Sequence, residues 1–183
     1  MRPRQVHVNR TTEVAEVVVR LNLDGEGAGA MQTGFPFLDH MLTIFARHSG
    51  FDLEVQCRAC ESDPDGPAQE IAACLGLAFA KTLEDSKGMM RSGHAYAPVD
   101  EHLARTVVEI SGHPRLVYRV AAPPPHLGAT EAGLVERFWH AFVVPARINL
   151  HIELLYGREG LPACEAVFKA TGRALREACR DLL

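Results

Sequence analysis

The chain has 183 residues and a mass of 20.0 kDa, which suits one compact unit rather than two large domains. With 47% hydrophobic and 23% charged residues, the composition is that of a soluble globular protein and excludes a disordered or fibrous one. The formal charge of -4 leaves no basic footprint for nucleic acid.

Signals for export or membrane insertion are missing from the sequence. No stretch approaches the roughly 18 uninterrupted apolar residues of a membrane-spanning helix. The N-terminal residues 1–7 are charged and lack the apolar core of a secretory signal. We therefore predict a cytoplasmic protein with neither membrane nor nucleic acid as a partner.

Cysteine usage points to reduced thiols, because the five cysteines form an odd set and mostly stand alone in apolar runs. Cys57 and Cys60 have the spacing of a zinc half-site or a redox pair. No second close pair of Cys or His completes a tetrahedral zinc site. Two unrelated thiols at a strand end is therefore the simpler interpretation.

The first half of the chain alternates between β-branched and helical apolar patterns. We predict, in chain order, a strand at 16–23, a turn at 24–27, a helix at 36–50, a strand at 51–57, a polar segment at 61–67 and a helix at 68–83.

The second half repeats this order. We predict strands at 103–110 and 116–120 around a turn at 111–114, a loop with prolines at 123–125, a helix at 131–144, a strand at 148–155 and a helix at 163–182. Both halves thus follow strand, strand, helix, strand, helix, which indicates an internal duplication.

The predicted fold class is α/β, in α+β layers, with each half placing its helices on one face of a four-stranded sheet. No linker separates the halves. We therefore predict a single domain over 1–183, with the first half at about 1–88 and the second at about 89–183.

Several segments, spread over nearly the whole chain, resemble the imidazoleglycerol-phosphate dehydratase family. They are Leu-Asn-Leu-Asp-Gly at 21–25, Thr-Gly-Phe-Pro-Phe-Leu-Asp-His-Met-Leu at 33–42, Pro-Val-Asp-Glu at 98–101, Ile-Ser-Gly-His-Pro at 110–114, Leu-His at 150–151, Glu-Ala-Val-Phe-Lys-Ala at 165–170 and Arg-Ala-Leu-Arg at 173–176. Their common order and spacing make the resemblance specific.

The resemblance implies a homo-oligomer built from trimers and a dehydration step of histidine biosynthesis, from imidazole glycerol phosphate to imidazole acetol phosphate. It also implies two manganese ions, bound by histidines and carboxylates of neighbouring subunits, which hold the substrate's ring as an imidazolate. The family carries a His-His-x-x-Glu run at a helix start in each half.

This chain keeps neither run. Asp-Gly-Pro-Ala-Gln-Glu at 65–70 replaces the first, with Gln69 in place of the glutamate, and the second keeps only Glu165. The metal ligands that remain by position are His40, His151 and Glu165. If His40 is a ligand, the neighbouring Asp39 carboxylate would orient its ring. Simpler interpretations stand beside these: histidines that pack or hydrogen bond within an interface, and a glutamate whose charge is favourable at a helix start.

The phosphate contacts of the family are half kept. Arg91 and Lys169 occupy phosphate-binding positions, whereas the arginine of the turn at 110–114 is replaced by His113. Arg91 and Lys169 are equally explained as surface cations. A small phosphorylated ligand near these two residues is the corresponding prediction.

Three functions remain open. The first is a family member that has lost dehydratase activity, binds manganese weakly or not at all, and serves in binding, regulation or assembly, because three donors cannot hold two six-coordinate ions. The second is an active dehydratase whose rebuilt site uses Asp63, Asp65 and Glu70. The third is a metal-free reaction with His40 or His151 as general base. Because metal ligands join trimers in the family, their loss also predicts a smaller assembly, down to the bare trimer.

Overall fold

The computed structural model describes residues 4–60, 62–84, 88–120, 129–158 and 160–182. The first half contains β1 (Gln5–Thr11), β2 (Ala15–Asn22), β3 (Gly29–Gln32), α1 (Pro36–Ser49), β4 (Asp52–Ala59) and α2 (Asp65–Leu83). The second half contains β5 (Ser92–Val99), β6 (His102–Glu109), β7 (Arg115–Arg119), α3 (Ala129–Ala146), β8 (Asn149–Tyr156) and α4 (Leu161–Ala178).

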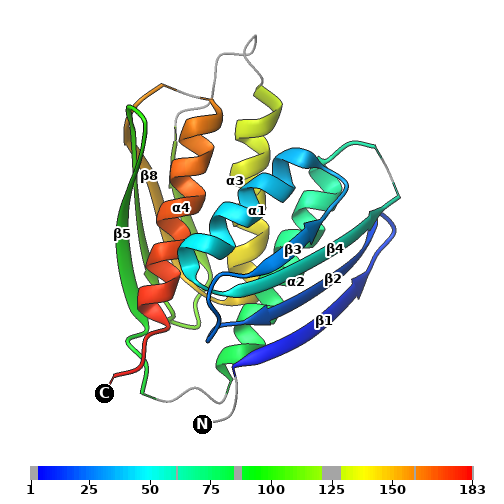
Figure 1. Cartoon of the computed structure of the whole chain (residues 1–183), viewed down its shortest axis with the longest axis horizontal. Coiled ribbons are helices and arrows are strands. Elements are labelled where there is room, and N and C mark those ends of the chain that lie inside the picture. The colour runs from blue at the N-terminus through cyan, green and yellow to red at the C-terminus, as the bar shows by residue number, and fades with distance from the viewer. Residues whose placement is uncertain (1–3, 61, 85–87, 121–128, 159, 183) are drawn as a thin grey trace.

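Each half forms a four-stranded sheet with the same topology. The strand orders are β1-β2-β4-β3 and β5-β6-β8-β7, and only the last pair of each sheet is parallel. The four helices lie between the two sheets (Figure 1). The predicted duplicated α/β fold is confirmed. Three strands precede the first helix of each half, where the predicted order names two and the predicted ranges of the first half include one.

Helix packing joins the two halves. α1 packs against α4, and α2 packs against α3; we call these contacts the α1–α4 seam and the α2–α3 seam. Glycines allow the close approach of the helices. A Cβ on Gly76 of α2 would lie 2.3 Å from the carbonyl oxygen of Phe142, and one on Gly172 of α4 would lie 2.9 Å from that of Phe45.

Aromatic side chains fill the space between the seams, and Trp139 is at their centre. Its ring centroid lies 4.8 Å from that of Phe168, 5.2 Å from Phe138 and 5.5 Å from Phe142. Tilted and edge-on pairs of this kind contribute about 0.5–1.5 kcal/mol each beyond the area they bury. One aromatic core therefore holds both halves together.

The sequence did not locate the edge strands β1, β3 and β5, and it extended the last helix to 182 whereas α4 ends at Ala178. The prolines predicted in a loop at 123–125 lie outside the described residues. In the described part of the chain, no helix is long and apolar enough to span a membrane. The five cysteines are free thiols.

Candidate functional site

The start of α1 presents His40. Pro36 opens the helix, and the Asp39 carboxylate accepts hydrogen bonds from the Thr33 backbone N–H at 2.9 Å and hydroxyl at 2.8 Å. These bonds tie the first turn of α1 to the chain that enters it, although Phe35 at the N-cap position has no side-chain capping hydrogen bond. Asp39 thus contacts Thr33, and its role in orienting the ring of His40 stays a prediction.

The carboxylate that contacts His40 is Glu165. The Nε2 atom of His40 lies 2.6 Å from Oε1 of Glu165, across the α1–α4 seam. The side chains are 49% and 24% exposed, so solvent reaches the pair. The structure therefore brings together two of the three predicted metal positions, and it does so in one chain.

His151 lies elsewhere. It is exposed on β8, where the residues on either side of it, Leu150 and Ile152, are buried against the helices. Its neighbours on the outer face of the sheet are Val107 of β6 and Val117 of β7. Since α4 covers the inner face of this sheet, His151 and Glu165 are on opposite sides of it within one chain.

The duplication places an arginine where the other half has His40. A residue with left-handed backbone follows each helix: Gly50 follows α1 and Arg147 follows α3. His40 lies ten positions before Gly50, and Arg137 lies ten positions before Arg147. The offset of 97 residues that relates β4 to β8 gives the same pairing, since 40 + 97 = 137. Arg137 is thus the equivalent of His40.

The equivalent of Glu165 is an amide. Gln69 and Glu165 each precede a seam glycine by seven positions (76 − 69 and 172 − 165). In the α2–α3 seam the Nε atom of Arg137 donates to Asp65 at 2.6 Å, and the Gln69 amide lies 3.4 Å from the same carboxylate. An arginine–carboxylate pair therefore replaces the histidine–carboxylate pair of the α1–α4 seam.

The carboxylates of the predicted rebuilt site also have other partners. Glu70 lies 2.5 Å from Arg10 of β1, while Asp65 is held by Arg137 of α3. Asp63 accepts the backbone N–H of Asp65 at 3.0 Å. Because Asp65 and Glu70 are separated by about 140° around the helix, they face different neighbours. The structure does not bring these carboxylates to one point.

The two phosphate-binding positions are likewise apart. Arg91 donates from its guanidinium to the carbonyl oxygen of Ile110, at 3.1 and 3.3 Å, just before β5 begins. Lys169 donates to the carbonyl oxygen of Pro98 at 3.0 Å, near the other end of β5. Within one chain Arg91 and Lys169 do not form a common pocket, and their role in binding phosphate stays a prediction.

Manganese does not fit the donors that a single chain assembles. The ion prefers six oxygen or imidazole ligands, and among the described residues no group of three or more His, Cys, Asp or Glu side chains could hold a metal. His40 and Glu165 supply two donors. Arginine supplies none, because a guanidinium has no lone pair to donate.

Comparison with known proteins shows the family. The sequence model of imidazoleglycerol-phosphate dehydratase matches residues 33–175. The imidazoleglycerol-phosphate dehydratase of Chromobacterium violaceum is 44% identical over 177 residues, covering 96% of this chain and 90% of that protein. The protein of the same name from Heliobacterium modesticaldum is 45% identical over 170 residues, covering 92% and 87%.

Solved structures agree. Imidazoleglycerol-phosphate dehydratase from Staphylococcus aureus superposes with a TM-score of 0.85 at 33% identity, covering 97% of this chain and 99% of that chain. The Pyrococcus furiosus enzyme, solved in complex with (S)-C348, gives 0.79 at 26% identity, covering 95% and 94%. The fold thus places the chain among duplicated α/β proteins of this type. The chain belongs to the imidazoleglycerol-phosphate dehydratase family, and the predicted homology to this enzyme of histidine biosynthesis is confirmed.

Sequence reasoning missed Arg137 and its pair with Asp65. The signal was present, because the repeat offset that relates the two halves leads from His40 to Arg137. It also assigned no site role to Arg173 and Arg176, the basic side chains that follow Lys169 along α4 at helical spacing, although it noted segment 173–176 for its resemblance to the family.

Proposed function

We propose that this chain is a family member that has lost the manganese-dependent dehydration of imidazole glycerol phosphate and persists as a binding or assembly protein. One observation carries the proposal. In the α2–α3 seam, Arg137 and Gln69 stand at the positions equivalent to His40 and Glu165, and Arg137 already neutralises the Asp65 carboxylate. A guanidinium repels a divalent cation and keeps its charge at every physiological pH.

The family resemblance implies that two Lewis acids would stabilise the ring anion of the substrate. The α1–α4 seam retains two donors for one ion, and the α2–α3 seam holds a permanent cation in place of the other. A guanidinium can hydrogen bond to an imidazole ring but cannot coordinate it. The expected loss is therefore in the dehydration step rather than in the fold.

Metal analysis of the purified protein after incubation with manganese, coupled to a dehydration assay on imidazole glycerol phosphate, tests this function. We expect less than one tightly bound ion per chain and no turnover. About two tightly bound ions with turnover would overturn the proposal and favour a rebuilt site at Asp63, Asp65 and Glu70.

Self-association is the second part of the proposal, and the outer face of the second sheet supports it. Tyr96, Val107 and Tyr156 are 51%, 44% and 62% exposed there. Both outer faces carry an ion pair, Arg20–Glu54 at 2.8 Å on the first sheet and Arg105–Glu153 at 2.5 Å on the second. Among the described residues, however, the large apolar side chains that are exposed on a sheet belong to the second sheet. An uncovered apolar sheet face is typical of a protein–protein interface.

Sedimentation of Val107→Asp tests this interface. A buried carboxylate without a partner disfavours association, so we expect a smaller particle than the unsubstituted protein forms, with or without manganese. Arg20→Asp, at the matching position on the first sheet, is the control and should leave the size unchanged. An unchanged size for Val107→Asp would contradict the assignment of this face, and a large particle that forms only with manganese would contradict the loss of metal sites.

A further inference from the structure

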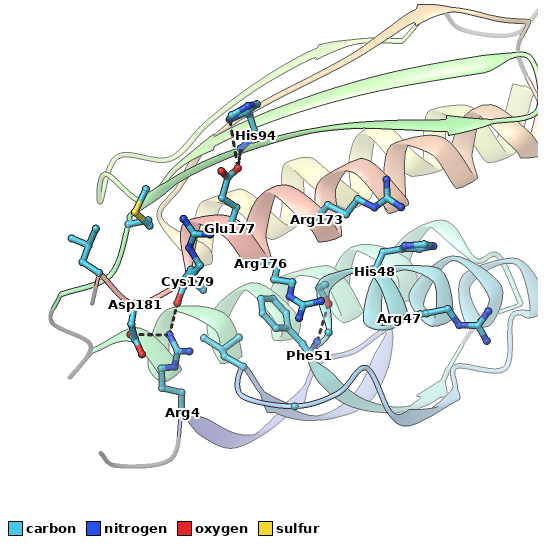
Figure 2. Close-up of a pocket in the computed structure, with 17 residues that line it drawn as sticks. Arg4, Arg47, His48, Phe51, His94, Arg173, Arg176, Glu177, Cys179 and Asp181 are labelled. Atoms are coloured by element: carbon cyan, nitrogen blue, oxygen red, sulfur yellow. Dashed lines mark hydrogen bonds and ion pairs between the residues drawn. The ribbon is translucent and has the colours of Figure 1, made fainter.

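A groove of about 1220 Å³ opens between the C-terminal end of α1 and the C-terminal half of α4. Figure 2 shows Arg176 of α4 between the two helices, with Arg173 of α4 and Arg47 and His48 of α1 along the same gap. This groove lies beyond Lys169 on α4, away from the His40–Glu165 pair. None of the predicted site residues lines it.

The acidic groups of the groove are already engaged. Glu177 accepts the backbone N–H of His94 at 2.6 Å, and Asp181 lies 3.9 Å from the guanidinium of Arg4. Arg4 also pairs with Asp24, outside the groove. The carboxylates are therefore committed at the end of the groove near Arg4 and β5, as Figure 2 shows.

The central arginines lack acidic partners. Arg47, Arg173 and Arg176 form no ion pair with any residue that the structure describes, and Arg173 makes one 3.4 Å hydrogen bond to the carbonyl oxygen of Tyr96. Arg176 lies over Gly50, where α1 ends. The negative end of a helix dipole offsets about half of one charge. A positive excess therefore remains, in a chain whose net charge is -4.

His48 lies within this positive field. Burial lowers the pKa of His48, and the nearby charges of Arg173, Lys169 and Arg47 lower it further. These are the charged groups that face the ring, two from α4 and one from its own helix. The positive potential that disfavours an imidazolium favours an anion at the same place.

We propose that this groove binds a phosphate group, free or carried as a monoester by a small molecule, through Arg47, Arg173 and Arg176. Guanidinium groups match the paired oxygens of phosphate and bind them by charge-assisted hydrogen bonds. Neither family phosphate position lines the groove: the Arg91 guanidinium donates to the carbonyl oxygen of Ile110, and Lys169, although its charge reaches His48, donates to that of Pro98.

Calorimetric titration of the full chain with inorganic phosphate, at low ionic strength, tests the site. Loss of one charge-assisted bond weakens binding by about tenfold or more, so Arg47→Ala and Arg176→Ala should each raise the Kd by at least that factor. Arg20→Ala removes the same charge from the outer face of the first sheet and should change the Kd by less than about twofold. Because Arg47 and Arg176 are exposed, circular dichroism should show that all variants remain folded.

A second readout follows His48 directly. In NMR titrations, bound phosphate should raise the pKa of His48, and Arg176→Ala should abolish that response to phosphate. Glycerol 3-phosphate distinguishes the two sources of the group: tighter binding than inorganic phosphate indicates a phosphorylated small molecule, and equal binding indicates the free ion.

Three outcomes would overturn the site. One is the absence of saturable binding. Another is equal weakening by Arg20→Ala, which would indicate only a diffuse field. The third is loss of binding in Arg91→Ala with full binding in Arg176→Ala, which would place the anion at the family position and leave the proposed loss of dehydration unaffected.

Discussion

The α1–α4 and α2–α3 seams share one backbone plan and differ in the side chains at their equivalent ends. One presents His40 against Glu165, and the other presents Arg137 against Asp65 and Gln69. A neutral imidazole can exchange its carboxylate partner for a metal ion, whereas a guanidinium cannot. The difference teaches that one arginine can neutralise the carboxylate of a seam in place of a metal ion, and that the seam then no longer has a side chain able to coordinate the metal.

The largest expected effect is on the free energy of unfolding, and it tests whether the helices of the two seams are equally close. Gly76→Ala places a methyl group 2.3 Å from a backbone oxygen of α3, so the helices must separate. We expect a loss of roughly 2 kcal/mol in the free energy of unfolding, measured by urea denaturation. Gly172→Ala, at 2.9 Å from Phe45, should lose about 1 kcal/mol or less, because alanine also favours the helix. Equal losses would show that the seams are equally tight.

The next effect concerns the chemical difference itself. The double substitution Arg137→His with Gln69→Glu gives the α2–α3 seam the side chains of the α1–α4 seam. We expect the affinity for manganese, measured from the free-ion EPR signal, to rise by about tenfold or more. The mirror-image variant, His40→Arg with Glu165→Gln, should not raise it. If the first variant binds manganese no better than the unsubstituted chain, then the replacement of a histidine by Arg137 does not explain the loss of metal binding.

A smaller effect is expected from the ion pair between Arg137 and Asp65. Both side chains are partly exposed, at 47% and 34%, so solvent screens the pair. Arg137→Ala should lower the free energy of unfolding by about 0.2–1 kcal/mol, and less at high salt. A double-mutant cycle with Asp65→Asn isolates the coupling. A loss that does not change with salt would point to packing of the arginine stem instead.

The smallest effect is a pH dependence confined to one seam. His48 has a lowered pKa in the folded chain, chiefly from burial, so between its unfolded pKa near 6.5 and its lower folded value the unfolded state binds more protons. Stability is therefore full above about pH 6.5 and declines as the pH falls below it. His48→Gln should flatten this slope in denaturation measured from pH 7.5 to 5.5. The equivalent position in α3, at 48 + 97, is Pro145, which cannot titrate. If the free energy of unfolding of His48→Gln depends on pH as steeply as that of the unsubstituted chain, other titratable groups cause the dependence.

Strong periodicity made most of the fold predictable. The helices α1, α2 and α3 carry apolar side chains at helical spacing, and the central strands β2, β4, β6 and β8 are rich in Val, Ile and Leu. The edge strands gave weaker patterns. β3 has four residues, and β5 reads Ser-Gly-His-Ala-Tyr-Ala-Pro-Val, where alanine and glycine fill the inward positions against α4. Small residues there permit close packing but carry little β signal.

The candidate site was predictable one residue at a time but not as a set. Position in the family motifs identified His40 and Glu165, and the structure joins them. Whether Arg91 and Lys169 meet depends on where β5 carries them, which spacing along the chain does not tell. The cationic groove depends on which helices pack together, and no local pattern encodes that α4 lies beside α1.

Every seam in this molecule pairs a helix of one half with a helix of the other. A single half, produced as a separate fragment, would leave Phe45 or Trp139 facing water and would have to find a second fragment to cover it. We expect the two halves, expressed as separate chains, to stay insoluble apart and to fold when mixed. Joining the two halves in one chain is also what lets the two seams carry different side chains, because each half then has its own sequence.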